Sequence, residues 1–406
     1  MTAPERHAGP GKSAPCKTGP CETGPCETGL YVHWPFCLSR CPYCDFNSHV
    51  RASIDQDRWR NALLAEMDWQ AAETSGRRLS SIFIGGGTPS LMDAATVAAI
   101  IDRAARHWSF ADDIEISLEA NPGAVDAERF AGFRLAGINR LSIGVQALDD
   151  DALRQLGRRH DLATALDAIT VARNLFPRMS FDLIYARPGQ TAKAWLAELA
   201  RALDLAADHL SLYQLTLERG TPFYAAWQRG ELAPLGEEDA ASLFETTQAA
   251  LADAGLPAYE ISNHARPGAE CRHNLIYWRS GDCIPIGPGA HGRLTAGNQR
   301  RAIHRIRLPE AWLTAVERDG HATRESTVLS EAERLDEFML MGLRLTEGIH
   351  RGAFRAALGG EIEDRVARAR IDALAAEGLL ECDAAGLRLT AAGRQRLNAV
   401  LAWLLT

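Results

Sequence analysis

Short apolar runs alternate with longer amphipathic stretches along most of the chain, beginning at residue 30. The short runs have the length of buried strands, and the longer stretches carry apolar residues at the three- and four-residue spacing of helices. The predicted strands are Leu30–Phe36, Ser81–Gly86, Ile114–Glu119, Arg140–Gln146, Ser180–Tyr185 and Leu210–Leu217. The predicted helices are Arg58–Ala72, Ala94–Trp108, Ala127–Ala136, Ala163–Leu175, Ala192–Ala206 and Glu238–Ala254. Six successive strand–helix units require parallel pairing with right-handed crossovers, so the pattern predicts an α/β fold with an open six-unit (β/α) barrel.

The pattern changes after the sixth unit. Ala258–Asn263 predicts one more short strand, and we expect the barrel and its extension to cover residues 29–325. Residues 326–406 predict a winged-helix-like domain with helices, a two-strand wing over Gly378–Leu389 and a final helix. Its predicted helices are Ser330–Leu345, Phe354–Leu358 and Glu363–Glu377. Because acidic residues are interspersed and no basic stripe is present, we expect this domain to pack or to dock a partner rather than bind DNA.

Residues 1–28 contain an imperfect five-residue repeat, which places cysteines at 16, 21 and 26 within Pro-Cys-(Lys/Glu)-Thr-Gly units. Small polar residues with repeated Gly and Pro bury too little surface to offset the entropy lost on ordering. We therefore expect a disordered low-complexity tail. Two alternatives are a metal- or haem-capturing tail that uses Cys16, Cys21 and Cys26, and a start codon placed too far upstream.

Composition and charge narrow the classes of function. The net charge is −8 and the sequence pI is about 5.9, which disfavours a nucleic-acid-binding surface. No apolar run approaches the ~20 residues of a membrane-spanning helix, and the first thirty residues do not have the pattern of a secretory signal. The nine cysteines lack the regular spacing of a disulfide framework. We therefore expect a cytoplasmic protein. Any contact with a membrane-bound acceptor is expected to be peripheral docking.

Three cysteines follow the first predicted strand in a C-x3-C-x2-C pattern, at Cys37, Cys41 and Cys44. Thiolates are the soft ligands that iron–sulfur clusters require, and a tight loop of cysteines is the usual way for a chain to supply them. Three ligands would leave one iron of a four-iron cluster open to a small molecule. A structural zinc site is an alternative, because His33 and His49 are close in sequence, and three incidental thiols are another.

Polar residues and glycines stand where later strands end, which is where (β/α) barrels carry their chemistry. Each residue alone is compatible with an ordinary turn or strand end. Together they form a candidate ligand-binding rim, with glycines that let backbone amides approach a ligand closely. The residues are Gly85-Gly86-Gly87-Thr88-Pro89 after the second strand, Glu119 and Gln146 after the third and fourth, Arg158 in the next turn, and Asp182 within the fifth.

The cysteine motif and its surroundings, Tyr31-Val-His-Trp-Pro-Phe-Cys and Cys41-Pro-Tyr-Cys-Asp-Phe-Asn-Ser, resemble the coproporphyrinogen-dehydrogenase-like branch of the radical S-adenosylmethionine superfamily. The resemblance implies a [4Fe-4S] cluster on the three cysteines, with S-adenosylmethionine chelating the fourth iron. It also implies that Tyr31, Gly86 and Glu119 bind this molecule. Positions expected in the same cavity, some of them around a second S-adenosylmethionine, are Tyr43, Gly87, Thr88, Gln146, Arg158 and Asp182.

Two further segments extend the resemblance. His273-Asn274-Leu-Ile-Tyr277-Trp278 is similar to the H-N-x-x-Y-W signature of the haem-chaperone (HemW-type) members, which implies a haem pocket formed by these four named residues. The alternative is a packed aromatic pair with a hydrogen-bonded histidine. The turn Ile286–Gly292 resembles a family segment that closes the cavity over the adenine side. The chain departs from the family at Ala186-Arg187-Pro188-Gly189, where Gly-Leu-Pro-Gly is usual, and Arg187 is expected to add positive charge near the cavity.

Two functions from different classes follow from the resemblance. One is a haem chaperone that passes haem to an acceptor protein, whose identity the sequence does not indicate. The other is an enzyme, the oxygen-independent coproporphyrinogen III dehydrogenase. The dehydrogenases carry a fourth cysteine two residues after the third, and here that position is Phe46. They also have a structured N-terminal segment, whereas this chain has the low-complexity repeat. These differences and the H-N-x-x-Y-W run favour the chaperone.

Overall fold

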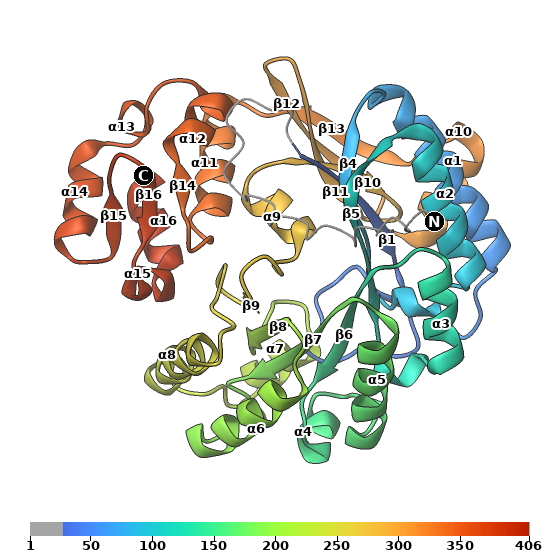
Figure 1. The fold of residues 1–406 in the computed structure, drawn as a ribbon, viewed down its shortest axis with the longest axis horizontal. Coiled ribbons are helices and arrows are strands. Elements are labelled where there is room, and N and C mark those ends of the chain that lie inside the picture. The colour runs from blue at the N-terminus through green and yellow to red at the C-terminus, as the bar shows by residue number, and fades with distance from the viewer. Residues whose placement is uncertain (1–26, 406) are drawn as a thin grey trace, which may run out of the picture.

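The computed structural model describes residues 27–405 and is built around one large sheet of eleven strands (Figure 1). Six strands lie side by side in chain order and pair in parallel, which confirms the predicted parallel half-barrel. They are β1 (Thr28–Trp34), β4 (Arg78–Gly86), β5 (Ser109–Ala120), β6 (Arg140–Gln146), β7 (Arg178–Tyr185) and β8 (His209–Gln214). The tail cysteines fall outside the described residues.

Helices between these strands cover the outer face of the curved sheet (Figure 1). The long ones are α1 (Gln56–Glu73), α2 (Ala94–His107), α3 (Ala127–Leu135), α5 (Leu162–Leu175), α6 (Ala192–Leu205) and α8 (Glu237–Asp253), as the periodicity predicted. Shorter elements are β2 (Phe36–Cys37), β3 (His49–Val50), η1 (Pro89–Leu91), η2 (Pro122–Ala124), α4 (Asp150–Gln155) and α7 (Pro222–Gln228).

Alternation along each strand separates the sheet into an apolar face and a polar face. On β1, Leu30, Val32 and Trp34 are fully buried in the main core, while Tyr31 and His33 point to the other side, into the barrel. The same alternation continues around the barrel because paired strands keep side chains of one face in register. The inner face is therefore lined by polar groups, among them Glu115, Ser117, Glu119, Ser142, Asp182, His209 and Ser211.

An antiparallel extension completes the sheet beyond β1. Strand β10 (Asp282–Ile286) pairs in parallel with β1, and three antiparallel strands follow it. These are β11 (His291–Ala296), β12 (Gln299–Arg305) and β13 (Thr323–Val328), with α10 (Pro309–Asp319) before the last. The predicted strand at Ala258–Asn263 was misplaced: β9 is Asn263–Ala265, antiparallel to β8, and Ala258 forms only an isolated bridge.

The C-terminal residues form a second hydrophobic core, from Phe338 to Leu404. Figure 1 shows this domain to one side of the barrel, beyond α9 (Arg272–Trp278). Its small sheet has three strands rather than the predicted two-strand wing, because β14 joins the hairpin through Gly386 and Leu387. The elements are α11 (Glu331–Gly342), β14 (Ile349–His350), α12 (Arg351–Leu358), α13 (Ile362–Arg365), α14 (Arg368–Ala376), β15 (Leu380–Cys382), β16 (Gly386–Leu389), α15 (Ala391–Gln395) and α16 (Leu397–Leu405).

Within residues 27–405, no helix combines the length and the hydropathy that crossing a bilayer requires. The predicted division of the chain at residues 325 and 326 falls within β13, whose residues still pair with β12 of the large sheet.

Candidate functional site

Of the three cysteines of the C-x3-C-x2-C motif, Cys37 ends β2, shortly after the carboxyl end of β1, and Cys41 and Cys44 lie in the loop between β2 and β3. Cys37 is buried, and Cys41 and Cys44 are partly exposed. A turn holds the loop, in which the amide of Cys44 donates to the carbonyl of Cys41 at 3.1 Å. The loop end is fixed to the strand by the amide of His49, which donates to the carbonyl of Pro35 at 2.7 Å. The barrel thus presents all three thiols from one short, anchored segment.

Residues predicted at the strand ends contact these thiols. The Thr88 hydroxyl donates to Cys37 Sγ at 3.3 Å, and Arg158 Nη1 donates to Cys41 Sγ at 3.4 Å. Arg158 Nη2 donates to the carbonyl of Gly144 at 2.7 Å, which holds the guanidinium beside the loop. A Cβ at Gly87 would approach the carbonyl oxygen of Phe36 to 2.8 Å, so only glycine lets the second strand end pack here. A hydroxyl donor and a cation therefore stabilise thiolate charge in this loop.

The donor set fits an iron–sulfur cluster better than a zinc ion. Within residues 27–405, no group of three or more His, Cys, Asp or Glu side chains has the arrangement needed to hold one metal ion. His33, the nearest histidine in the zinc alternative, already has partners on both ring nitrogens: the Tyr31 hydroxyl at 2.9 Å and the Asn47 carbonyl at 2.9 Å. A cubane cluster takes each thiolate on a different iron, so its ligands need not converge on one point. Arg158 Nε is buried without a partner beside the loop, as expected where an anionic group would bind.

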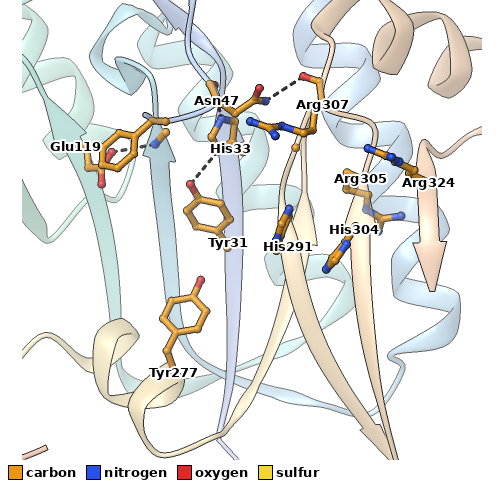
Figure 2. A pocket seen from close by; sticks show the side chains of 13 residues that line it. Tyr31, His33, Asn47, Glu119, Tyr277, His291, His304, Arg305, Arg307 and Arg324 are labelled. Carbon is orange, nitrogen blue, oxygen red and sulfur yellow. Dashed lines mark hydrogen bonds between the residues drawn. The ribbon is translucent and has the colours of Figure 1, made fainter. Parts of the chain in front are cut away.

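A cavity of about 610 Å³ opens next to the cysteine loop, inside the barrel. Tyr31, Gly86 and Glu119, the three residues expected around the cluster-bound molecule, line one wall of it (Figure 2). The Gly86 amide donates to Glu119 Oε2 at 2.9 Å, which ties the ends of β4 and β5 together. Gly86 has φ +120°, and a Cβ there would meet His33 Cε1 at 2.7 Å, so the close approach requires glycine.

Two buried carboxyl groups give the inner face its electrostatic character. Burial, followed by the nearby Asp182, raises the pKa of Glu119 to about 8, while the hydrogen bond from Gly86 acts in the opposite direction. Burial raises the pKa of Asp182 to about 6, against hydrogen bonds from Ser211 and Ser142. Burial thus shifts both carboxyls toward the protonated form, Glu119 further than Asp182, and donors or a cationic ligand entering the barrel would stabilise their charge.

The remaining predicted positions lie at the edge of the cavity or behind it. Gln146 ends β6 with φ +75°, a left-handed conformation that is uncommon for a residue with a side chain. Tyr43 packs against Phe223, with ring centroids 6.3 Å apart, and is not among the residues that line the cavity. Asp182 lies deeper in the barrel, where the Ser142 hydroxyl donates to Oδ1 at 3.4 Å.

The structure corrects the expectation for Arg187. Its guanidinium is buried and turned away from the cavity, where it donates to Glu198 Oε2 at 2.5 Å and to the carbonyl of Ile184 at 2.7 Å. Glu198 also accepts from the Leu148 amide at 2.8 Å, so the pair joins α6 to the barrel wall. Because its charge is neutralised by this ion pair, Arg187 does not add positive charge to the cavity.

Helix α9 carries the H-N-x-x-Y-W motif, and it places His273 in the protein interior. His273 Nδ1 lies 2.7 Å from the Ser81 hydroxyl and Nε2 lies 2.9 Å from the Tyr277 hydroxyl. The ring is 2% exposed and packs on Gly29, where a Cβ would approach it to 3.1 Å. With both ring nitrogens bonded, His273 does not offer a lone pair to an iron atom here. This is the hydrogen-bonded arrangement that the sequence left open as the alternative.

The other motif residues connect α9 to its surroundings. Tyr277 reaches the cavity wall, and Asn274 Nδ2 donates to the Tyr259 hydroxyl at 3.3 Å. The Trp278 ring faces the C-terminal domain, with the guanidinium carbon of Arg344 4.5 Å from its centroid. The motif therefore joins the barrel interior to the second domain, and of its four residues Tyr277 lines the cavity.

Sequence reasoning missed most of the opposite wall of the cavity. Only the turn Ile286–Gly292, which contains His291, was expected at the cavity, and His291 was one of several possible haem ligands beside His273. His291, His304 and Arg324 line this wall from β11, β12 and β13, Arg307 lines it from the segment after β12, and Asn47 closes the top (Figure 2). Asn47 Nδ2 donates to the carbonyls of Pro288 and Arg307, at 2.9 and 3.0 Å. The available signal was the alternation of polar and apolar residues from 291 to 305, which predicts antiparallel strands.

Comparison with known proteins places the chain. Residues 31–202 match the Radical SAM superfamily, and residues 329–396 match the HemN C-terminal domain. "Radical S-adenosyl methionine domain-containing protein 1, mitochondrial" of Mus musculus is 41% identical to the chain, over 93% of this chain and 87% of its own length. This chain belongs to the radical SAM superfamily.

Other relatives within the radical SAM superfamily include bacterial proteins. The "Heme chaperone HemW" of Escherichia coli (strain K12) is 38% identical over 92% of this chain and 96% of its own length. Among solved structures, coproporphyrinogen III oxidase (HemN) of Escherichia coli superposes with a TM-score of 0.80, covering 95% of this chain and 91% of that one. At 23% sequence identity, this likeness confirms the fold alone.

Membership of the radical SAM superfamily implies a [4Fe-4S] cluster and S-adenosylmethionine. The structure provides three thiols in one anchored loop, beside a cavity lined by Tyr31, Gly86 and Glu119. The residues present therefore fit both groups.

Proposed function

We propose that the protein is a haem chaperone of the radical SAM fold, which binds a [4Fe-4S] cluster, S-adenosylmethionine and haem and passes haem to an acceptor protein. The observation that carries the proposal is the relationship to the bacterial proteins named Heme chaperone HemW, which extends over more than nine-tenths of the chain. Similarity limited to the radical SAM domain would support membership of the superfamily but not a shared function with these proteins.

In this proposal Cys37, Cys41 and Cys44 hold the cluster, and Thr88 and Arg158 stabilise thiolate charge through the contacts described above. The cluster supplies a redox-active metal centre with one iron open to S-adenosylmethionine. Residues proposed to bind this molecule are Tyr31, Gly86 and Glu119, with Tyr43, Gly87, Thr88, Gln146, Arg158 and Asp182 around them.

Phe46 supports the chaperone over the dehydrogenase. It occupies the position of the fourth cysteine of the dehydrogenases, lines the mouth of the cavity and is 61% exposed. An exposed aromatic ring at this point suits contact with the apolar face of a porphyrin. The dehydrogenase remains the second candidate, because the chain shares its fold and keeps the cluster loop.

The test is an anaerobic comparison of two activities in one preparation of reconstituted full-length protein. Coproporphyrinogen III, S-adenosylmethionine and a reductant are supplied in one arm, and ferric haem is titrated in the other. We expect a saturable Soret band with a stoichiometry near one haem per chain and no vinyl product. Vinyl product at a rate of many turnovers would contradict the chaperone, and so would the absence of saturable haem binding. Transfer is then tested with apo-haemoproteins as acceptors.

A further inference from the structure

The cavity wall formed by β11, β12 and β13 differs in chemistry from the wall that carries Tyr31 and Glu119. His291, His304, Arg307 and Arg324 stand on it, facing the cavity (Figure 2). None of these four residues belongs to the cluster loop or to the parallel strands. A ligand can bind these side chains only where their polar atoms do not already have partners within the protein.

The two exposed arginines on this wall have unused donors. Within residues 27–405, the guanidinium groups of Arg307 and Arg324 make no hydrogen bond or ion pair. Arg305, on the same wall, is the contrasting case: it is fully buried and donates to the carbonyl of Pro285 at 3.1 Å, with Glu66 3.5 Å away. A single unpaired arginine is ordinary on a protein surface. Two at one cavity, next to a structural arginine that is fully bonded, form a cationic rim that is open to an anion.

The imidazoles of this wall form a stacked pair. His291 and His304 are partners across β11 and β12, and their ring centroids are 4.2 Å apart with an interplanar angle of 19°. His304 Nδ1 lies 3.6 Å from Glu325 Oε2, which orients that ring. The His291 ring makes no hydrogen bond within the described part of the chain, and the residue is exposed. Among the cavity histidines, His33 has both nitrogens engaged and His304 has Glu325 beside Nδ1, whereas His291 has neither nitrogen bonded within the described residues.

The chemistry of these groups selects a ligand. Haem is a flat apolar ring with two carboxylates on one edge and a metal at its centre. Guanidinium groups bind carboxylates in a bidentate manner, and a neutral imidazole is a common axial ligand of haem iron. Phe46 adds an exposed aromatic ring at the same mouth, 61% exposed.

Resting on the proposed function, we propose that this wall is the haem site, in which Arg307 and Arg324 bind the two propionate carboxylates and His291 ligates the iron. His304 stacks behind His291 and holds its ring. Gly86 and Glu119 remain on the other wall of the same cavity, which the cysteine loop reaches through Phe46 and Asn47, so the proposed haem lies across from residues proposed to bind S-adenosylmethionine. His273 then has a packing role, as its two hydrogen bonds require.

The decisive experiment compares haem with its dimethyl ester, which lacks the carboxylate charges. Full-length, cluster-containing protein is titrated with each ligand anaerobically, and binding is followed at the Soret band. The Arg307→Gln/Arg324→Gln double variant is expected to bind haem about tenfold to a hundredfold more weakly, because each lost charge-assisted contact contributes about tenfold. The ester is expected to bind wild type and variant equally. The control is Arg266→Gln/Arg318→Gln, which removes two exposed arginines away from the cavity.

The iron ligand is tested in parallel by the variants His291→Ala and His273→Ala. We expect His291→Ala to shift the Soret maximum and His273→Ala to leave it in place, with His107→Ala as a surface control. Iron content, cluster absorbance and S-adenosylmethionine binding are measured in every variant, and they are expected to be retained in the Arg307→Gln/Arg324→Gln and His291→Ala proteins.

The outcomes separate this site from the proposed function. If wild type binds haem and the double arginine variant binds it equally well, or loses haem and ester to the same extent, the site is refuted and the chaperone stands. Weakened S-adenosylmethionine binding with unchanged haem binding would also refute the site and assign the wall to that molecule. A Soret shift in His273→Ala but not in His291→Ala would overturn the iron ligand. If wild type fails to bind haem saturably, the proposed function itself fails.

Discussion

The two walls of the cavity solve different problems with different chemistry. On the parallel wall, polar groups are buried and bonded to one another, as in the pairs Gly86–Glu119 and Tyr31–His33. On the antiparallel wall, the side chains of Arg307, Arg324 and His291 are exposed and make no hydrogen bond or ion pair within the described residues. Bonded groups are held in one geometry, which suits a resident cofactor. Unpaired groups accept a ligand without first breaking internal contacts, which suits cargo that must also leave.

The largest effect on cofactor binding is expected at the cysteine loop, which lies at the end of the parallel strands. Replacing Cys41 with Ser should remove the brown charge-transfer absorbance and most of the bound iron, because a three-thiolate site that loses one soft ligand no longer holds a cubane. Iron and sulfide analysis after anaerobic reconstitution measures this. Cys382→Ser, in the C-terminal domain, is the control and should keep a full cluster. A full cluster in the Cys41→Ser protein would disprove the ligand set.

The second effect concerns His273, which the comparison assigns to the bonded, structural side. His273→Ala removes a 2%-exposed ring with two hydrogen bonds, to Ser81 and Tyr277. We expect the free energy of unfolding to fall by about 2–4 kcal/mol, since a cavity and unsatisfied hydroxyls remain. Urea unfolding followed by circular dichroism provides the measurement. A loss under 1 kcal/mol, no greater than in His107→Ala, would show that the histidine is not a packing residue.

The third test measures how strongly the Glu119 carboxyl is buried, through the pH dependence of stability. Its pKa is raised from 4.5 to about 8, so between these values the folded protein holds a proton that the unfolded chain has lost. Stability therefore falls as pH rises through this window, by up to about 1.4 kcal/mol per pH unit. Glu119→Gln has no such proton, so its stability relative to wild type should increase steadily from pH 5.5 to 8. Glu128→Gln, on the surface, is the matched control for replacing Glu by Gln, and a flat profile for Glu119→Gln would mean that the Glu119 carboxyl is solvated.

The smallest effect is expected where α9 leaves the barrel. The cation–π contact between Trp278 and Arg344 spans two domains at 4.5 Å, and such a contact contributes about 1 kcal/mol. Trp278→Leu should lower the stability of the C-terminal domain by about that amount and leave haem binding unchanged, because the ring does not line the cavity. Differential scanning calorimetry detects the shift, with Trp227→Leu as the exposed control. Weaker haem binding by this variant would indicate that the H-N-x-x-Y-W motif contributes to the haem site.

The parallel half of the fold was predictable because its signal is local. Each strand is a short apolar run, and each following helix has its own apolar stripe, so β6 was predicted at its observed bounds, Arg140–Gln146. The antiparallel strands were missed because charged residues interrupt their apolar positions, as in Gln299–Arg305. Their formation also depends on pairing with another strand, which a local pattern does not reveal. The short β9 was displaced for a similar reason: three residues carry too little pattern to fix a register.

At the candidate site, the sequence predicted which polar residues lie at the ends of strands. It did not predict the direction in which their side chains point. Gly86 and Glu119 were placed correctly at one cavity wall, because strand ends of a parallel barrel converge. Arg187 and His273 were read as cavity groups, yet each is buried by partners far along the chain or on another element, Glu198 and Ser81. A motif gives residue types, whereas orientation depends on those partners.

The central position of β1 has a consequence for how the protein is made. This first strand is flanked by β4 on one side and by β10 on the other, and Asn47 in the cysteine loop donates to carbonyls 241 and 260 positions further along. On a ribosome, the nascent chain must be extended past Arg307 before these bonds can form. The loop thus acquires its final shape only late in synthesis, since long-range pairing waits for its partner strand. Iron and sulfide would therefore be delivered to the finished barrel, in which Cys41 and Cys44 are partly exposed and Cys37 is buried.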